Sequence, residues 1–227
     1  KLDLVFCVDA TSSMKPYIAA VANCMKKAID EIVQLNKGKL QTFRVAIVSY
    51  TDIPKNTRVT ETTAKPVDVC EFTTDLESVK RWAERKSNNC SCGFSPNDWA
   101  ENMASGFDAA LQLDWSNDDE TVRALVLMTD APPHGVENKM KKKLKISTAS
   151  YDDYPNGDPF KNEISEMHDT LTEDLGVTMM CIGVGEINHP SMEGIAEEWL
   201  KILLAEEHEE KYYLYLDEGS ASQLAAL

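Results

Sequence analysis

Three oxygen-bearing side chains follow the first apolar run of the chain at alternate positions. The run at residues 4–8 ends in Asp9, and Thr11 and Ser13 come next. Carboxylate and hydroxyl oxygens are hard ligands, the type that suits Mg²⁺ or Mn²⁺. A phosphate cradle would need glycines and usually a lysine, and this loop has neither. The loop therefore predicts a divalent-cation site.

A second carboxylate stands in the same setting farther along the chain. The apolar run at residues 123–129 ends in Asp130, which precedes the breaker sequence Ala-Pro-Pro-His-Gly. If both runs are neighbouring parallel strands, Asp9 and Asp130 lie at one rim of the sheet, where open α/β sheets place their ligands. The competing interpretation is structural: Ser12 or Ser13 caps the following helix, and Asp9 accepts a hydrogen bond at its N-terminus.

Strands and helices must alternate to position these loops. Strands are expected at residues 4–8, 43–50, 65–72, 123–129, 177–184 and 211–216. The first helix is expected to carry the periodic apolar residues 18–35, with Pro16 in its first turn. Further helices are expected after a cap at Thr73 or Thr74, at 99–113, up to about 174, at 191–207 and from 219 onward. This order predicts an α/β fold with a doubly wound, mainly parallel sheet, one antiparallel edge strand and helices on both faces.

The chain is expected to form a single domain over residues 1–227, because no linker rich in proline, glycine or serine divides it. It has no initiator methionine and starts almost inside the first strand, so we expect it to be part of a longer chain. No apolar run approaches the roughly 18 residues of a membrane span.

The net charge of the chain limits the partners that it can bind, and the positions of its cysteines indicate the cellular compartment. Acidic residues outnumber basic ones 38 to 23, a formal net charge of −15, which argues against nucleic acid and anionic membranes as partners. Cys7, Cys24 and Cys181 lie in expected core elements and are interpreted as reduced, which favours an intracellular origin. Cys90 and Cys92 are read as two free thiols in a loop, with a disulfide or redox pair as the alternative.

Two further segments resemble functional motifs only superficially. The basic stretch 137–145 is read as a solvated loop or short helix rather than a nucleic-acid surface. The stretch 151–163 has Asp152 and Glu163 placed as in a calcium loop, but Tyr154 occupies a ligand position and no helix leads in. A turn-rich insertion is the better interpretation.

The two carboxylate loops resemble a known family. VFCVDATSSM and LMTD look like the first and third loops of a von Willebrand factor A (vWA) domain, and FTTDLESVKRW and ENMASGFDAAL extend the similarity along the chain. In that family these loops build the metal-ion-dependent adhesion site, usually with Mg²⁺. The resemblance implies that Thr11 and Ser13 bind the metal through their hydroxyls, and that Asp9 and Asp130 act directly or through water.

The middle loop of the family pattern corresponds here to SPNDWAEN. It is similar to the branch with a Gly-Gly-x-Asp-x-Pro-Glu loop, which implies Asp98 as a metal ligand and aligns Glu101 with the glutamate at the helix start. Ser95 and Asn97 remain alternative ligands. A third carboxylate would lower the residual positive charge of the site, so an acidic side chain of a partner would be attracted less strongly.

The loop sequences VDATSSMKPYI and TDAPPHG are closer to intracellular vWA domains, in particular those joined to alpha-type protein kinases. The resemblance implies a non-enzymatic, cytoplasmic module that binds a protein ligand at its metal rim. A haloacid-dehalogenase-type phosphatase is one alternative, but the general acid that it needs two residues after Asp9 is replaced by Thr11. A dinucleotide enzyme lacks its glycine fingerprint after the first strand. A metal-free interaction scaffold is the remaining alternative.

Overall fold

The chain folds around one six-stranded sheet. The computed structural model describes residues 1–53, 60, 63, 65–88, 100–136, 152–184 and 213–216. The strands are β1 (Leu2–Asp9), β2 (Phe43–Tyr50), β3 (Val67–Thr73), β4 (Val122–Thr129), β5 (Val177–Val184) and β6 (Tyr213–Leu216). The helices are α1 (Ile18–Leu35), α2 (Leu76–Asn88), α3 (Met103–Leu111) and α5 (Ile164–Asp169), the last continued by a π-helical turn, Thr170–Asp174.

The strand order is β3-β2-β1-β4-β5-β6, with β1 at the centre. β1 pairs in parallel with β2 and β4, β5 pairs in parallel with β4 and β6, and β3 pairs antiparallel with β2 at the edge. The predicted fold class, a mainly parallel α/β sheet with one antiparallel edge strand, is therefore confirmed.

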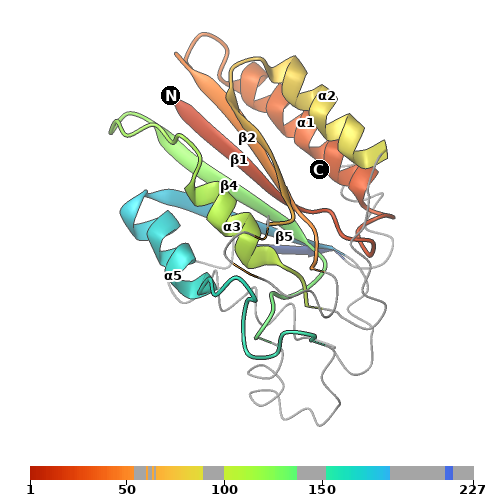
Figure 1. Cartoon of the computed structure of the whole chain (residues 1–227). Coiled ribbons are helices and arrows are strands. Elements are labelled where there is room, and N and C mark those ends of the chain that lie inside the picture. Colours follow the sequence, from red (N-terminus) through yellow and green to blue (C-terminus); the bar gives the residue numbers. More distant parts are fainter. Residues whose placement is uncertain are drawn as a thin grey trace.

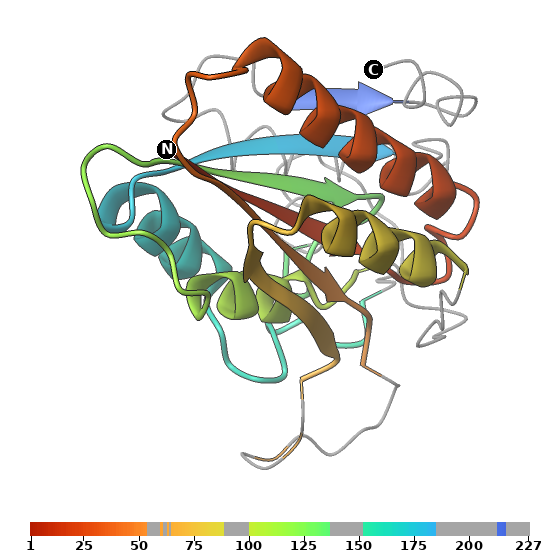
Figure 2. The same ribbon diagram turned by 90° about the horizontal axis from the view of Figure 1, so that it is seen from above.

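Helices cover both faces of the sheet. Helices α1 and α2 lie on one face, and α3 and α5 lie on the other (Figures 1 and 2). Successive side chains of a strand point to opposite faces, so β1 feeds both cores. Val5 and Cys7 belong to the core under α3 and α5, whereas Leu4, Phe6 and Val8 belong to the core under α1 and α2. Burial on both faces explains why the run is continuously apolar.

Helix α3 packs closely on β2 because of one glycine. A Cβ atom at Gly106 would lie 2.6 Å from Cδ1 of the buried Tyr50 ring and 3.1 Å from Cys7 Sγ. The helix begins at Met103, four residues later than the expected start at 99. The reason is tertiary: Glu101 forms an isolated parallel bridge with Pro133, which keeps that part of the chain extended.

The start of α2 differs from the predicted cap. Asp75 Oδ1 accepts the backbone N–H of Ser78 at 3.1 Å, so Asp75 caps the helix. Thr73 instead accepts the backbone N–H of Asp75 at 3.0 Å, a local turn before the helix. The predicted cap at Thr73 or Thr74 is wrong. The expected helices at 191–207 and from 219 onward lie outside the described residues, as do Cys90, Cys92 and the basic stretch 137–145.

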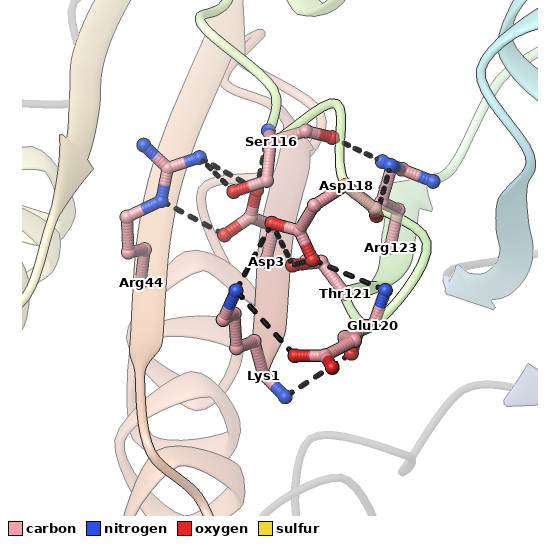
Figure 3. Close-up of polar contacts among 8 residues, drawn as sticks. All are labelled: Lys1, Asp3, Arg44, Ser116, Asp118, Glu120, Thr121 and Arg123. Carbon is pink, nitrogen blue, oxygen red and sulfur yellow. Dashed lines mark hydrogen bonds and ion pairs between the residues drawn. The ribbon is translucent and has the colours of Figure 1, made fainter.

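A charged network closes the amino ends of the strands (Figure 3). Asp3 is 1% exposed and accepts two hydrogen bonds from Arg44, at 2.9 and 2.6 Å, and one from the backbone N–H of Ser116 at 2.8 Å. Arg123 donates to the Ser116 and Asp118 carbonyls at 2.6 and 2.9 Å. These contacts attach the segment before β4 to the starts of β1 and β2, at the end of the sheet opposite Asp9.

Candidate functional site

The first and third loops of the predicted site lie at one rim of the sheet. β1 and β4 are parallel neighbours, with Val8 paired to Met128, and Asp9 and Asp130 stand one and two positions beyond these partners. Because parallel strands end at the same edge, both side chains come from the carboxyl rim. Thr11 and Ser13 follow Asp9 in the loop that leads to α1.

Asp9 is held from two directions. It is fully buried, and its Oδ1 accepts the backbone N–H of Thr11 at 2.9 Å and the Thr11 hydroxyl at 2.7 Å. Its Oδ2 lies 3.0 Å from the Thr129 hydroxyl, which also lies 3.0 Å from the Ala131 carbonyl. Both oxygens of Asp9 therefore have protein donors within reach, and the carboxylate is fixed between β1 and β4.

Asp130 has a buried oxygen that the protein does not satisfy. Its Oδ1 is buried and has no hydrogen-bond partner in the described part of the chain. A buried carboxylate oxygen without a donor is costly unless water, an ion or a proton accompanies it. Asp130 Oδ1 is therefore an acceptor that a water, a cation or a proton would satisfy.

The pKa values of the two carboxyl groups rise together. Burial raises the pKa of Asp9, against the hydrogen bonds from Thr11 and Thr129 that lower it. Burial, and after it the negative charge of Asp9, raises the pKa of Asp130. Two buried carboxyl groups that repel each other resist simultaneous ionisation, and a cation between them would remove that cost.

The hydroxyls of the first loop are not helix caps. Thr11 is 1% exposed, Ser13 is exposed, and their oxygens are 3.1 Å apart. Helix α1 begins only at Ile18, its N-cap is Tyr17, and no side chain caps it. Ser12 and Ser13 are too far upstream, so the interpretation that either of them caps α1 is wrong. The Thr11 proton is donated to Asp9, so in the contact between the two hydroxyls the Thr11 oxygen accepts from Ser13.

The middle-loop ligand is not described. Asp98, Ser95 and Asn97 all lie outside the described residues. Glu101 is described and is 8% exposed; its backbone N–H donates to the Pro132 carbonyl at 2.9 Å, which joins the middle loop to the loop after β4. No group of three or more His, Cys, Asp or Glu side chains suited to a metal occurs within the described residues. Within the described residues, the oxygens that could join Asp9 and Asp130 around a cation are therefore hydroxyls.

Sequence reasoning missed several polar residues at the rim. Thr129 precedes Asp130 in the LMTD motif and was assigned only to the strand, although its hydroxyl approaches Asp9. The ring of His134, in the APPHG breaker, lies between Asp52 and Asp152. Thr129 could have been suspected from its position next to Asp130, but the partners of His134 are distant in sequence and left no local pattern.

The segment that superficially resembles a calcium loop is built from turns, as predicted. Asp152 directs Oδ1 at the His134 ring and at the Tyr154 N–H, and directs Oδ2 at the Gly135 N–H. Both oxygens are engaged by the protein, which argues against a calcium ligand at Asp152.

Comparison with known proteins relates the chain to others by fold. No family model and no curated protein matches the sequence. The pilus adhesin SpaC from Lactobacillus rhamnosus GG matches with a TM-score of 0.61 at 13% identity, over 99% of this chain and 29% of the adhesin. The conserved hypothetical protein BatB from Bacteroides thetaiotaomicron matches with a TM-score of 0.54 at 14% identity, over 100% of this chain and 95% of BatB.

A third match is proximal thread matrix protein 1 from the mussel byssus, with a TM-score of 0.52 at 15% identity, over 99% of this chain and 44% of that protein. This chain thus spans less than a third of SpaC and less than half of the thread matrix protein. The pilus adhesins and BatB have vWA-like folds, so at these identities the likeness shows a vWA-like architecture for this chain and nothing finer.

Two further observations bear on the expected environment of the chain. Among the described helices, none combines the length and the apolar character that crossing a membrane requires. Cys7, Cys24, Cys70 and Cys181 are free thiols, and all but Cys70 are buried. The predicted core placement of Cys7, Cys24 and Cys181 is therefore confirmed.

Proposed function

We propose that this chain is a protein-binding module whose carboxyl rim holds a divalent cation, Mg²⁺ or Mn²⁺. The observation that carries the proposal is the pair Asp9 and Asp130, on neighbouring parallel strands, with a buried Asp130 oxygen that lacks a donor in the described part of the chain. Carboxylate and hydroxyl oxygens fit these hard cations.

Each residue has a distinct role in the proposed site. Thr11 and Ser13 offer hydroxyl oxygens 3.1 Å apart, and Asp130 offers its unsatisfied Oδ1. Asp9 acts through a bound water, because its oxygens already accept hydrogen bonds from Thr11 and Thr129. Asp98 supplies the middle-loop ligand, as the family resemblance implies. The bound cation would offset the repulsion between the carboxylates and offer an open coordination position to a partner.

A binding role suits the chemistry of the rim better than catalysis. A haloacid-dehalogenase-type phosphatase needs a general acid at the position that Thr11 occupies here. The Thr11 hydroxyl instead donates a hydrogen bond to Asp9 Oδ1 at 2.7 Å. A hydroxyl in that role does not transfer protons at neutral pH. The fold neighbours include a pilus adhesin and a thread matrix protein, which is consistent with a partner-binding surface.

The partner and the compartment follow from the family resemblance. We propose that a protein ligand binds at the metal rim. We also propose that the chain is a cytoplasmic vWA domain of the type joined to alpha-type protein kinases. The free thiols of Cys7, Cys24, Cys70 and Cys181 support a reducing environment. The negative charge of −15 disfavours nucleic acid and anionic membranes as partners.

Calorimetric titration with Mg²⁺ and Mn²⁺ tests the cation site directly. We expect one site in the wild type and loss of binding in Asp130→Asn, with Asp119→Asn as the matched control, because Asp119 is exposed in the loop before β4, at the other end of the sheet. Equal heats for the wild type and Asp130→Asn would reject the site. Partner capture that survives EDTA would place the partner surface elsewhere.

A further inference from the structure

A buried histidine joins three segments of the carboxyl rim. His134 lies four positions after Asp130, and its side chain is 1% exposed. Its Nε2 lies 2.9 Å from Asp52 Oδ1, just after β2, and its Nδ1 lies 2.9 Å from Asp152 Oδ1. The carboxyl groups of Asp52 and Asp152 are themselves buried, at 3% and 0% side-chain exposure.

The two contacts constrain the protonation of the ring. An ionised carboxylate only accepts hydrogen bonds, and a neutral imidazole has only one N–H. A neutral ring would therefore turn a lone pair toward one of the two carboxylates, in a buried place where such repulsion is costly. With both carboxyl groups ionised, both contacts are hydrogen bonds only when both ring nitrogens carry protons.

The surroundings of the ring favour the charged form. Burial disfavours the imidazolium, but the hydrogen bonds to Asp152 and Asp52 outweigh burial and raise the pKa of His134 to about 10. Among the described residues, the other groups that face the ring are Asp158, whose carboxyl group interacts with the charge of His134, and the Tyr154 ring, edge-on with centroids 5.0 Å apart. None of these groups is a cation that would repel the imidazolium.

Backbone contacts complete the junction. Asp152 Oδ2 accepts the Gly135 N–H at 2.7 Å, and the His134 N–H donates to the Glu101 carbonyl at 3.3 Å. Gly135 has φ +81°, and a Cβ there would lie 2.5 Å from Gly157 Cα, so the segment 152–163 packs directly on the loop after β4. The loop that starts at Asp130 is thus tied to the middle loop, to the β2 loop and to the segment 152–163.

We propose that His134 is a charged imidazolium at neutral pH and the positioning residue of the rim, which fixes the loop carrying Asp130 through Asp52 and Asp152. The positioning role rests on the proposed cation site, whereas the charge state does not. A rigid outer contact of this kind keeps ligand oxygens in place before the cation arrives.

Imidazole nitrogen NMR on the wild type tests the charge state without any substitution. We expect both His134 ring nitrogens to show the shifts of a protonated imidazolium from pH 6 to pH 8.5, with the resonance assigned by its loss in His134→Gln. A neutral tautomer at pH 8 would overturn the charged junction.

Hydrogen exchange and Mn²⁺ calorimetry test the positioning role. In His134→Gln and Asp152→Asn we expect amides of residues 131–136 and 152–163 to exchange about tenfold faster, with the β1 amides unchanged. Mn²⁺ affinity should fall by about tenfold or more in the same variants. Asp153→Asn removes the neighbouring charge and serves as the matched control for Asp152→Asn, and His168→Gln serves for His134→Gln.

The outcomes separate the two proposals. Faster exchange with unchanged Mn²⁺ affinity would overturn the positioning role, and unchanged exchange in both variants would overturn the junction itself. If the wild type binds no Mn²⁺, the cation site and the positioning role both fail, while the NMR result still decides the charge of His134. If His134→Gln does not fold, Asp152→Asn, which preserves size, provides the same comparison.

Discussion

Thr129 on β4 reaches the carboxylate of Asp9 on the neighbouring strand. Thr129 Oγ1 lies 3.0 Å from Asp9 Oδ2, and both side chains are fully buried. The same hydroxyl accepts the backbone N–H of Ala131 at 3.2 Å, so one small side chain links the two strand ends and the loop after β4. The carboxylate of the first loop is thereby oriented by the strand that precedes Asp130.

Replacement of Thr129 by valine tests this link. Thr129→Val keeps the shape but removes the donor to Asp9 Oδ2, and an unsatisfied buried acceptor costs about 1–3 kcal/mol. We expect a loss of unfolding free energy of that size in urea denaturation, together with weaker Mg²⁺ binding in calorimetry. Thr60→Val, on an exposed residue, is the control. Unaltered stability and Mg²⁺ affinity would show that Asp9 does not depend on Thr129.

The raised pKa values of Asp9 and Asp130 predict how stability depends on pH without a cation. A carboxyl group whose pKa is higher in the folded state than in the unfolded state destabilises the fold once it must ionise. The free energy of unfolding that these groups contribute is therefore fully present below pH 3.8, the ordinary pKa of an aspartate. It is lost as the pH rises through their raised pKa values.

Divalent cation should reverse that loss. We expect the gain in unfolding free energy from saturating Mg²⁺ to be small at pH 5 and larger at pH 8, because the cation binds the ionised pair. Urea denaturation at the two pH values, with Mg²⁺ or with EDTA, measures the difference. A gain from Mg²⁺ that does not change with pH, or that persists in Asp130→Asn, would contradict a role for this pair.

Removal of Arg44 should expose the cost of the buried charge on Asp3. The Arg44 hydrogen bonds hold the pKa of Asp3 below its usual value, against burial, which raises it. Arg44→Met leaves that carboxylate without its main partner. We expect the free energy of unfolding in urea denaturation to fall by about 3 kcal/mol. This is the low end of the range for a buried ion pair, because the Arg44 side chain is 21% exposed.

The Asp3 interaction also has a defined pH signature. Because the folded-state pKa is lowered, its stabilisation is present above the ordinary value of 3.8 and is lost as the pH falls through the lowered value. Arg81→Met, at a side chain that is 63% exposed, is the control and should change little. Equal losses in both variants would mean that the Asp3 contacts add nothing specific.

Gly106 should tolerate no side chain. Gly106→Ala adds a Cβ 2.6 Å from the Tyr50 ring, and overpacking of this kind costs about 1–3 kcal/mol, more than the roughly 1 kcal/mol that alanine gains over glycine in a helix. We expect lower stability in thermal or urea unfolding. In the Tyr50→Leu background the same substitution should cost less, and an equal cost in both backgrounds would place the strain elsewhere.

Unbroken patterns of apolar residues made several strands and one helix predictable. The runs at 43–50 and 177–184 were predicted with the observed strand bounds, because most of their residues are apolar, as burial in a parallel sheet requires. The helical spacing of apolar residues predicted helix α1 as far as Leu35, but the predicted first turn held Pro16, whereas the observed helix begins at Ile18. In the same way, the ends of the apolar runs located Asp9 and Asp130, and the order of the elements predicted the sheet.

Contacts between distant segments could not be predicted in this way. Helix α3 starts at Met103 rather than at 99 because Glu101 pairs with Pro133, and no local pattern announces that bridge. The roles of metal ligands remain predictions for all five residues of the expected site: Asp9, Thr11, Ser13, Asp98 and Asp130.

The sequence by itself determined which stretches become strands and helices, and therefore that two carboxylates end adjacent parallel strands, because burial imposes a local periodicity on the residues. Only the tertiary structure decided that Thr129 orients Asp9 and that His134 lies between Asp52 and Asp152, 82 and 18 positions away. Such partnerships depend on strand register and on the paths of loops, which arise from packing across the whole sheet and leave no periodic trace in the chain.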